Sequence, residues 1–488
     1  MSFKKQIVLA LSFGLCACAV GPDFTPPVPP EVTGYTMTPM TDALSAGGDE
    51  TTQNLKLGQT VSKEWWSLFR SAQLNDVVTQ ALANNQTLAA AKATLAGAQE
   101  AVKQAEGGFY PQIDANTGFQ RQKSPPRPVS NLYSVGGVAS YALDVFGSTR
   151  RTVEKQEALA DNQHYQLGAA YLTLTGSVVT QSINLASLRE QLAATKGIVE
   201  DDEKNLKLVQ DKFAAGKVAQ SDVLTAQSQL ANDRTQLAPV QQQISVAKHA
   251  LAILVGQFPG VWAPPKFDMK EFTLPEDLPV SLPSEIVHQR PDILASEAQL
   301  HADSAAIGIA EAQMYPSINL SASATFESAA TSGLFSGSNL FWNLASGLAL
   351  PLFHGGALEA QTEQAVDIFK ASAATYQQTV LQAFGQVADT LRALKHDADL
   401  IDAQKQALNT ANAALALQQM SFAAGKSDVL QLLNAERGAQ QARLGYIRAQ
   451  SQRYQDTAQL FLSMGGGWWA AEKEAASKPS DSGSGKEL

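Results

Sequence analysis

Cysteine, histidine and serine are the residue types most able to do chemistry, and their placement here argues against catalysis. The only cysteines, Cys16 and Cys18, lie at the extreme N-terminus. A Cys-x-Cys pair without a nearby histidine offers too few ligands for a closed metal site. The six histidines include no pair at metal-ligand spacing with a supporting acid, and neither a Gly-x-Ser-x-Gly motif nor a phosphate-binding loop is present. We therefore expect no catalytic residue, no metal and no bound cofactor, and a protein that is not an enzyme.

The first eighteen residues look like an export signal followed by a lipidation site. Two lysines precede an apolar run over residues 7–15, which is too short to span a bilayer. Residues 15–18 (Leu-Cys-Ala-Cys) resemble a bacterial lipobox, in which diacylglycerol is joined to the cysteine and the chain is cut before it. We predict a signal peptide over 1–17 and a diacylglycerol thioether and N-acyl group on Cys18; an ordinary signal with two incidental cysteines is the alternative. By resemblance to other lipoproteins, Ala19 permits sorting to the outer membrane.

The formal net charge of -10 bears on the class of partner. An acidic chain without a basic patch repels phosphate backbones. We therefore expect no nucleic acid partner.

The elements that follow are organised as an internal duplication. Three pairs of segments match in the same order at a nearly constant offset: residues 107–119 and 311–326, residues 141–147 and 348–356, and residues 212–224 and 421–430. The repeat unit is too long for a solenoid of short repeats. One chain therefore contains two equivalent halves.

These matches divide the chain into a lipidated tether over 18–60, repeats over 61–264 and 265–465, and a disordered tail over 466–488. The proline-rich part of the tether, residues 21–30, cannot be helix or central strand. Within the tether, residues 33–60 carry no clear signal. Each repeat is expected to hold, in order, a shorter helix, a β-hairpin, a long helix and a final helix: 72–108, 109–147, 148–215 and 221–255, then 283–313, 314–353, 356–424 and 427–464.

Apolar and polar residues alternate in both predicted hairpins, as in Ile318, Leu320, Ala322 and Ala324 against the polar residues between them. A membrane strand needs this pattern over about ten residues, although a water-soluble sheet covering a core gives the same alternation. The lipobox favours the membrane. Because the smallest closed membrane barrels have about eight strands, four strands cannot close one, and several chains must contribute.

The long helical segments carry an apolar residue at every seventh position. A maintained period of seven predicts antiparallel helices wound into a left-handed coiled coil. About 66 residues would extend roughly 100 Å, several times a bilayer's hydrocarbon core, so these helices must project into water. A soluble helical bundle would explain the stripes but not the duplicated hairpins. Pro239 predicts a kink in the shorter helix of the first repeat. The stripes are Leu185, Leu192, Val199, Leu206 and Phe213; Leu394, Ile401, Leu408, Leu415 and Phe422; and Val223, Leu230, Leu237, Ile244 and Leu251.

Taken together, the chain resembles the outer membrane factor (TolC-like) family, in its lipoprotein, NodT-type branch. The matching stretches span nearly the whole chain in order and include CAVGPDFTPP (18–27), WWSLFRSAQLNDVVTQALANN (65–85), LAILVGQFPG (251–260) and RPDILASEAQLHADSAAIGIAEAQMYPSINLSAS (290–323). The resemblance implies a mainly α fold with membrane β-structure. In that fold three chains form a 12-stranded outer-membrane β-barrel, four strands each, continuous with a long periplasmic α-helical barrel and an equatorial domain.

The same resemblance places both Ala-Gly-Lys turns at a periplasmic tip that closes the duct. It implies that Asp428 lines the constriction and that Asp222, Lys217 and Lys426 belong to the turns whose polar links hold the closed state. Gln431 stands where some members carry a second aspartate. Helix capping is the simpler role for the two aspartates, because each follows a serine at a predicted helix start.

The function implied is that of an exit duct, lipid-anchored in the cell outer membrane and extending into the periplasm. It would act in a tripartite efflux pump, as a homotrimer with a periplasmic adaptor (membrane fusion protein) and an inner-membrane pump of the resistance-nodulation-division type. It would conduct substrates passively and contact outer-membrane lipids. The alternative is a non-channel coiled-coil lipoprotein that acts as a periplasmic spacer or adaptor.

Overall fold

The computed structural model describes residues 19–38, 43–44, 52–123, 125–126 and 128–468. The predicted signal peptide, the lipidation site Cys18 and the tail beyond residue 468 lie outside this part. The chain divides into two compact units. The first comprises Met1–Val28, Ala93–Tyr165 and Leu294–Thr379, and the second Pro29–Lys92, Gln166–Ile293 and Val380–Leu488. Each unit draws on both sequence repeats, so the compact units do not follow the division into 61–264 and 265–465.

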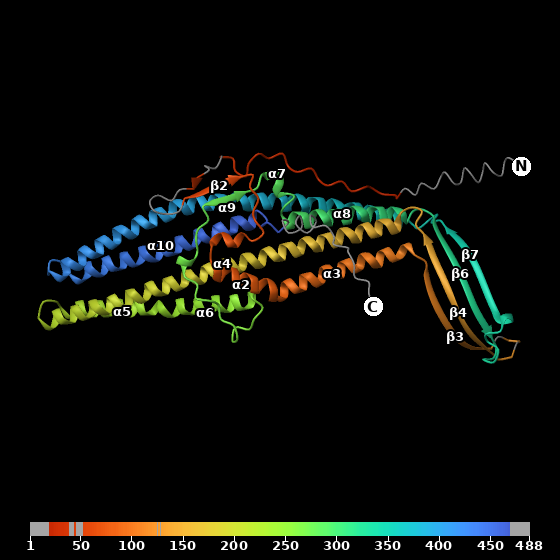
Figure 1. The fold of residues 1–488 in the computed structure, drawn as a ribbon, viewed down its shortest axis with the longest axis horizontal. Coiled ribbons are helices and arrows are strands. Elements are labelled where there is room, and N and C mark those ends of the chain that lie inside the picture. The colour runs from red at the N-terminus through yellow and green to blue at the C-terminus, as the bar shows by residue number, and fades with distance from the viewer. Residues whose placement is uncertain (1–18, 39–42, 45–51, 124, 127, 469–488) are drawn as a thin grey trace, which may run out of the picture. The chain divides into compact units, whose positions relative to one another are not determined.

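The first unit contains an antiparallel four-stranded sheet (Figure 1). The strands pair in the order β3-β4-β6-β7, so the two hairpins of the sequence repeats join along β4 and β6. The outer strands β3 and β7 each pair with one neighbour among the described residues. The strand bounds are β3 Gln112–Gln122, β4 Ser130–Leu143, β6 Ser317–Ser328 and β7 Leu340–Ala349.

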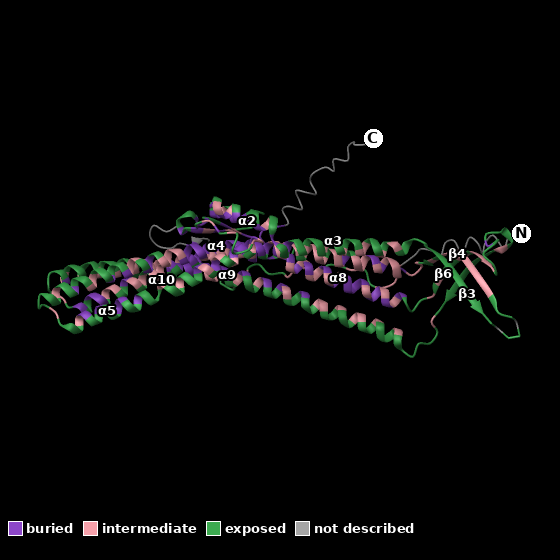
Figure 2. Cartoon of the chain, turned by 90° about the horizontal axis from the view of Figure 1, so that it is seen from below, coloured by how far each residue is buried: buried purple, intermediate pink, exposed green. Residues whose placement is uncertain are grey.

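The register gathers the alternating apolar residues of all four strands on one face. Residues directly opposite each other in antiparallel strands share a face. Ile113 pairs with Ala139, Phe119 with Tyr133, Tyr133 with Ser328, and Ala324 with Trp342. The described part of the chain does not cover this apolar face: Trp342 and Leu344 are each 76% exposed. The strands appear in the exposed and intermediate colours of Figure 2.

Two helices of 67 residues follow the hairpins, α4 (Ser148–Ala214) and α9 (Ala357–Ala423). Neither contains proline, so no backbone donor is missing along their length. None of the helices in the described ranges is both long and apolar enough to cross a membrane.

Three helices expected to be continuous are interrupted. Residues 72–108 form α2 (Ala72–Asn84) and α3 (Gln86–Glu106), because Asn85 leaves the helical conformation and its side chain accepts the Leu88 N–H at 3.0 Å. Residues 283–313 form α7 (Pro283–Ile286) and α8 (Pro291–Ala312), since the residue before a proline is forced out of the helix.

The third interruption corrects the expected position of the Pro239 kink. The helix predicted over 221–255 is divided at Gln236 into α5 (Gln220–Thr235) and α6 (Leu237–Leu254). Proline cannot bond the carbonyl four residues earlier and its ring clashes with that carbonyl. The break therefore lies one turn before Pro239, which occupies the first turn of α6.

The second unit holds a small sheet that the sequence did not indicate. It comprises β1 (Ala43–Leu44), β2 (Gln53–Leu57) and β5 (Asp277–Val280), with β2 parallel to β5. The tether expected over 18–60 is therefore too long, because part of 33–60 belongs to this sheet. Strands of two to five residues are too short to show a clear alternation. Residues 52 and 58–60 and the irregular stretch 19–38, with its prolines, contain neither helix nor strand.

Aromatic residues fill the core beside this sheet. Trp65 and Phe69, from the 3₁₀ helix η1 (Trp65–Phe69), are fully buried, as is Phe461. The rings of Trp65 and Phe461 lie 5.5 Å apart, and those of Phe69 and Tyr454 lie 6.2 Å apart. Phe461 and Tyr454 belong to α10 (Val429–Ser463), so this cluster fixes the C-terminal helix to the core of the second unit.

Candidate functional site

The two helical hairpins of the second unit end in turns of the same construction. Each long helix stops at a left-handed glycine, Gly216 with φ 68° and Gly425 with φ 70°. The following lysine N–H bonds back to a carbonyl of the last turn, Lys217 to Lys212 at 2.9 Å and Lys426 to Ser421 at 2.8 Å. Glycine reaches this conformation without the penalty that a Cβ imposes, which makes it the usual residue after a helix.

The two aspartates predicted at the tip cap the helices that follow these turns. Asp428 is the N-cap of α10, and its Oδ1 accepts the Gln431 N–H at 2.8 Å. Asp222 lies in the first turn of α5, and its Oδ2 accepts the Ala219 N–H at 2.9 Å. Capping is therefore observed at both positions. Lys217 and Lys426 are exposed, and the described chain provides no ion pair for either.

Just behind the turns, apolar residues of α4, α5, α9 and α10 form one cluster that holds the two hairpins together. Phe422 is 2% exposed within it, whereas Phe213, its equivalent in the first repeat, is 42% exposed. The Lys212 ammonium lies 3.6 Å from the centre of the Phe422 ring and donates to the Phe422 carbonyl. The cluster comprises Val209, Val223, Ala226, Phe422, Val429, Leu432 and Leu433, which are all buried.

Next to this cluster, polar residues join the first hairpin (α4, α5) to α10; we call this contact the polar seam. The Asn205 side chain donates to Glu436, Arg437 donates to Gln229 at 2.6 Å, and Gln440 donates to Asp233 at 3.2 Å. Asp202 is also buried in the seam. The seam thus consists of Asn205, Gln229, Arg437 and Gln440 around the three carboxyls of Asp202, Asp233 and Glu436.

Burial shifts the titration of the seam carboxyls. Loss of hydration raises the pKa of Asp202 to about 8, helped by a hydrogen bond to Asp233 and by the charges of Asp233, Glu436 and Asp201. Burial likewise raises the pKa of Glu436 to about 7, with Asp201 and Asp233 adding to the effect and the Asn205 hydrogen bond opposing it. Among the described residues, no group of three or more His, Cys, Asp or Glu side chains is arranged so that it could hold a metal ion.

The seam was not predicted from the sequence, although the heptads carry a signal for it. Asp202 and Asp233 lie three residues after the stripe positions Val199 and Leu230. Glu436 lies three residues after Leu433, which begins a less regular stripe in the last helix (Leu433, Ile447, Tyr454 and Phe461, interrupted by Gln440). In a coiled coil this is the second core position, which is normally apolar. An acid there in three helices indicates a buried polar contact.

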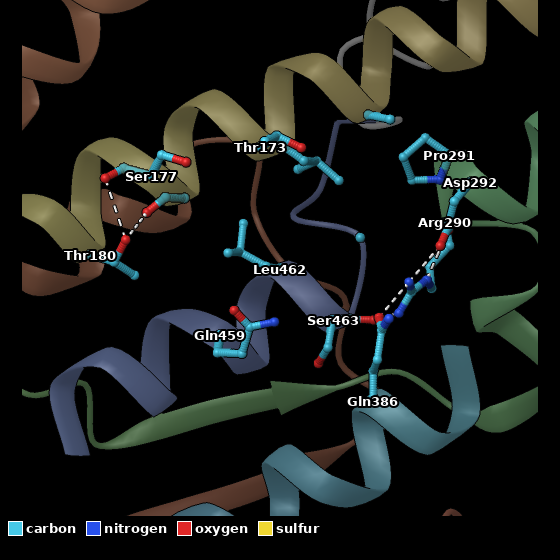
Figure 3. A pocket seen from close by; sticks show the side chains of 14 residues that line it. Thr173, Ser177, Thr180, Arg290, Pro291, Asp292, Gln386, Gln459, Leu462 and Ser463 are labelled. Atoms are coloured by element: carbon cyan, nitrogen blue, oxygen red, sulfur yellow. Dashed lines mark hydrogen bonds and ion pairs between the residues drawn. The ribbon is translucent and has the colours of Figure 1, made fainter. Parts of the chain in front are cut away.

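Elsewhere in the second unit, Arg290 lines a cavity of about 370 Å³ (Figure 3). Its guanidinium donates to Asp292 at 2.6 Å, to Gln386 of α9 at 2.8 Å and to the Ser463 carbonyl of α10 at 3.0 Å. These bonds join the start of α8 to α9 and α10. Because its hydrogen bonds are made within the protein, Arg290 serves a structural role here rather than binding a ligand.

In the first unit, the residues after Cys18 are bound to α4 and α8. The Arg151 guanidinium, 5% exposed, donates to the carbonyls of Val20 and Gly21 at 3.1 Å each and to Asp23 at 2.8 Å. Gly21 passes so close to Gly308 that an added Cβ would lie 2.4 Å from the Gly308 Cα. The chain is thus fixed to the first unit from its first described residues.

Two features define the class of protein: an open sheet with an exposed apolar face, and long helices that end in polar turns. They are typical of a membrane channel subunit that assembles with other copies. The profile of the family described as "Outer membrane efflux protein" matches residues 77–257 and 282–466. The chain belongs to this family. It is an outer-membrane channel of tripartite efflux systems with a TolC-like fold, it is not an enzyme, and the spacer alternative is excluded.

Relatives and solved structures agree with this assignment. The chain is 27% identical to nodulation protein T of Rhizobium leguminosarum bv. viciae, covering 95% of this chain and 93% of the relative. It is 26% identical to the protein of Salmonella typhimurium named "Probable outer membrane lipoprotein SilC", covering 83% of this chain and 88% of the relative. The structure of the outer-membrane channel OprN superposes with a TM-score of 0.83 at 25% identity, covering 92% of this chain and all of that one.

Proposed function

We propose that three copies of this chain close a 12-stranded barrel in the outer membrane and a helical barrel in the periplasm. The duct would conduct substrates passively, loaded by an inner-membrane pump of the resistance-nodulation-division type through a periplasmic adaptor. The observation that carries the proposal is the sheet in which β3 and β7 have free edges beside an exposed apolar face. In lipid a free strand edge leaves backbone groups without partners, so neighbouring copies must complete the wall.

We further propose that Asp222, Asp428, Lys217 and Lys426 hold the tip closed until the adaptor binds. The support is their position: both aspartates fix the start of a helix directly after an exposed turn, and both lysines are available to other copies. Adaptor binding would then shift the population between two packings of the same hairpins.

Single-channel conductance in planar bilayers tests this gate and separates charge from capping. Asparagine preserves the cap but removes the charge, whereas alanine removes both and costs about 1 kcal/mol per helix. If charge closes the gate, the double variant Asp222→Asn/Asp428→Asn and its alanine counterpart both raise conductance. If capping alone matters, only the alanine variant does so. The exposed Asp211→Ala is the matched control, and unchanged conductance in both double variants would place the gate elsewhere.

We propose that Cys18 carries the lipid anchor. Its support is the lipobox, the lipoprotein relative and the fixed path of the residues that follow it. Metabolic labelling with palmitate should mark the wild type and a Cys16→Ser variant but not Cys18→Ser. Label retained in Cys18→Ser would refute the assignment.

A further inference from the structure

Two carboxyls of the polar seam, Asp202 and Glu436, each have an oxygen without a hydrogen-bond partner, whereas Asp233 accepts from Gln229 at 2.6 Å and from Gln440 at 3.2 Å. Asp202 is 4% exposed, and neither its Oδ2 nor the buried Oε2 of Glu436 has a hydrogen-bond partner. Both residues line a cavity of about 80 Å³ between α4, α9 and α10. A buried ionised carboxylate without partners is costly, whereas a protonated one can donate. When protonated, Asp202 can donate to Asp233 across the first hairpin, which is the hydrogen bond that helps to raise its pKa.

We propose that these carboxyls form a proton-dependent lock on the tip: protonated, they hold α10 against the first hairpin, and ionised, they repel one another and release it. The lock rests on the proposed opening of the tip. It differs from the gate at Asp222 and Asp428, because it lies inside the packing between the hairpins rather than at the turns.

The charges on each surrounding helix leave the cluster without a counter-ion. From α4, Asp201 raises the pKa of Asp202 but is itself paired with Lys204 at 2.8 Å, and Glu203 is paired with Arg234 of α5 at 2.6 Å, so both of these cations are engaged with other acids. From α9, the cavity is lined by Asn412, Leu415 and Gln419, which carry no charge. No ion pair in the described chain involves Asp202, Asp233 or Glu436, so proton binding is the available means of neutralising them.

The arginines of α10 are engaged with other groups. Arg437 donates to the neutral Gln229 side chain at 2.6 Å. Arg443 lines the cavity but also acts on Glu190, whose pKa is raised chiefly by burial and which Arg443 partly stabilises in its charged form. Neither arginine forms an ion pair with the three seam carboxyls.

The direction of the effect follows from linkage. The pKa values of Asp202 and Glu436 are raised in the packed seam, to about 8 and about 7, and would return toward about 4 once water reaches them. Opening therefore releases protons, and rising pH favours it. For each such carboxyl, the opening equilibrium shifts about tenfold per pH unit between the two pKa values. The packed seam is fully stabilised at acidic pH and loses that stabilisation as pH rises toward 8.

Distances between spin labels test the lock directly. The described chain has no cysteine, so Gln210→Cys on α4 and Asn434→Cys on α10, both exposed, can be labelled specifically. In the full-length protein in lipid nanodiscs, the distance between labels should lengthen or broaden from pH 5.5 to pH 8.5. Asp202→Asn/Glu436→Gln mimics the protonated pair and should keep the short distance at every pH.

A second pair of carboxyls, in which Asp397 is buried and Asp456 is partly exposed, supplies the matched control. Asp397 of α9 and Asp456 of α10 lie within the second hairpin, and the pKa of Asp397 is likewise raised by burial and by Asp456. Asp397→Asn should leave the pH response of the label distance unchanged. A pH-independent distance in the wild type, or an unaltered response in Asp202→Asn/Glu436→Gln, would overturn the lock.

Conductance separates failure of the lock from failure of the gate. If the alanine variant of Asp222 and Asp428 raises conductance but the distance between labels in the wild type does not change with pH, the proposed gate is supported and the proposed lock is wrong. If the distance changes with pH but neither pH nor the turn variants alter conductance, the seam responds to protons but the tip does not control the duct. That result would overturn both the gate and the seam's role as a lock.

Discussion

Replacing Phe422 with alanine should loosen the tip, because this ring is the largest side chain of the apolar cluster between the hairpins. It is 2% exposed, and truncating a buried phenylalanine costs about 3–5 kcal/mol. The Lys212 ammonium above the ring would lose a further contact of about 0.5–2 kcal/mol. The equivalent Phe213 is 42% exposed and does not belong to this cluster. Phe213→Ala should therefore cost about 0.5 kcal/mol or less, as surface substitutions usually do.

Amide hydrogen exchange of the assembled protein measures this difference locally. A loss of about 4 kcal/mol of local stability in Phe422→Ala corresponds to roughly thousandfold faster exchange at the C-terminal end of α9 and the start of α10. Phe213→Ala should change the exchange of the equivalent α4 and α5 amides by less than about threefold. Equal acceleration in both variants, or none in Phe422→Ala, would refute the asymmetry between the two hairpins.

Three further predictions concern other parts of the chain. Gly256→Ala should lower the thermal unfolding temperature, since Gly256 has φ 75° and an added Cβ would lie 2.2 Å from the Asn84 carbonyl oxygen. The control Gly97→Ala should not lower it, because a Cβ at Gly97 would meet no atom within 4 Å. Asp397→Asn should remove part of the pH dependence of the free energy of unfolding. The folded-state pKa of Asp397 is raised to about 7, so its protonated form contributes its full stability below about pH 4, and this contribution is lost as pH rises through 7. An unchanged slope of unfolding free energy against pH would contradict this. Arg151→Ala should expose residues 19–24 to proteolysis by removing their hydrogen bonds, and unaltered cleavage would show that other contacts suffice.

The long helices and strands could be predicted from the sequence because their apolar patterns extend over many residues. The seven-residue stripe predicted a helix over 148–215, and α4 occupies Ser148–Ala214. Alternation predicted the strands, and the register adds that their apolar faces coincide. At the tip, the position of Asp428 after a serine predicted the cap that its Oδ1 forms.

Short elements, and contacts between residues far apart in the sequence, could not be predicted. The break between α2 and α3 depends on Asn85, whose amide also donates to the Leu254 carbonyl at 2.9 Å, a partner 169 residues away. The small sheet in the second unit pairs β2 with β5, and the whole first repeat lies between these strands in the sequence. The seam acids were visible as misfits in the heptads, but only the packing of the hairpins brings Asp202, Asp233 and Glu436 together.

Counting chains in the purified particle tests the central claim most directly. Native mass spectrometry of the full-length protein, released from detergent or nanodiscs, should give a mass of three copies with no stable smaller species. A stable single-copy particle that retains its β-structure would contradict the account, because the free edges of β3 and β7 would then persist in a membrane without partners.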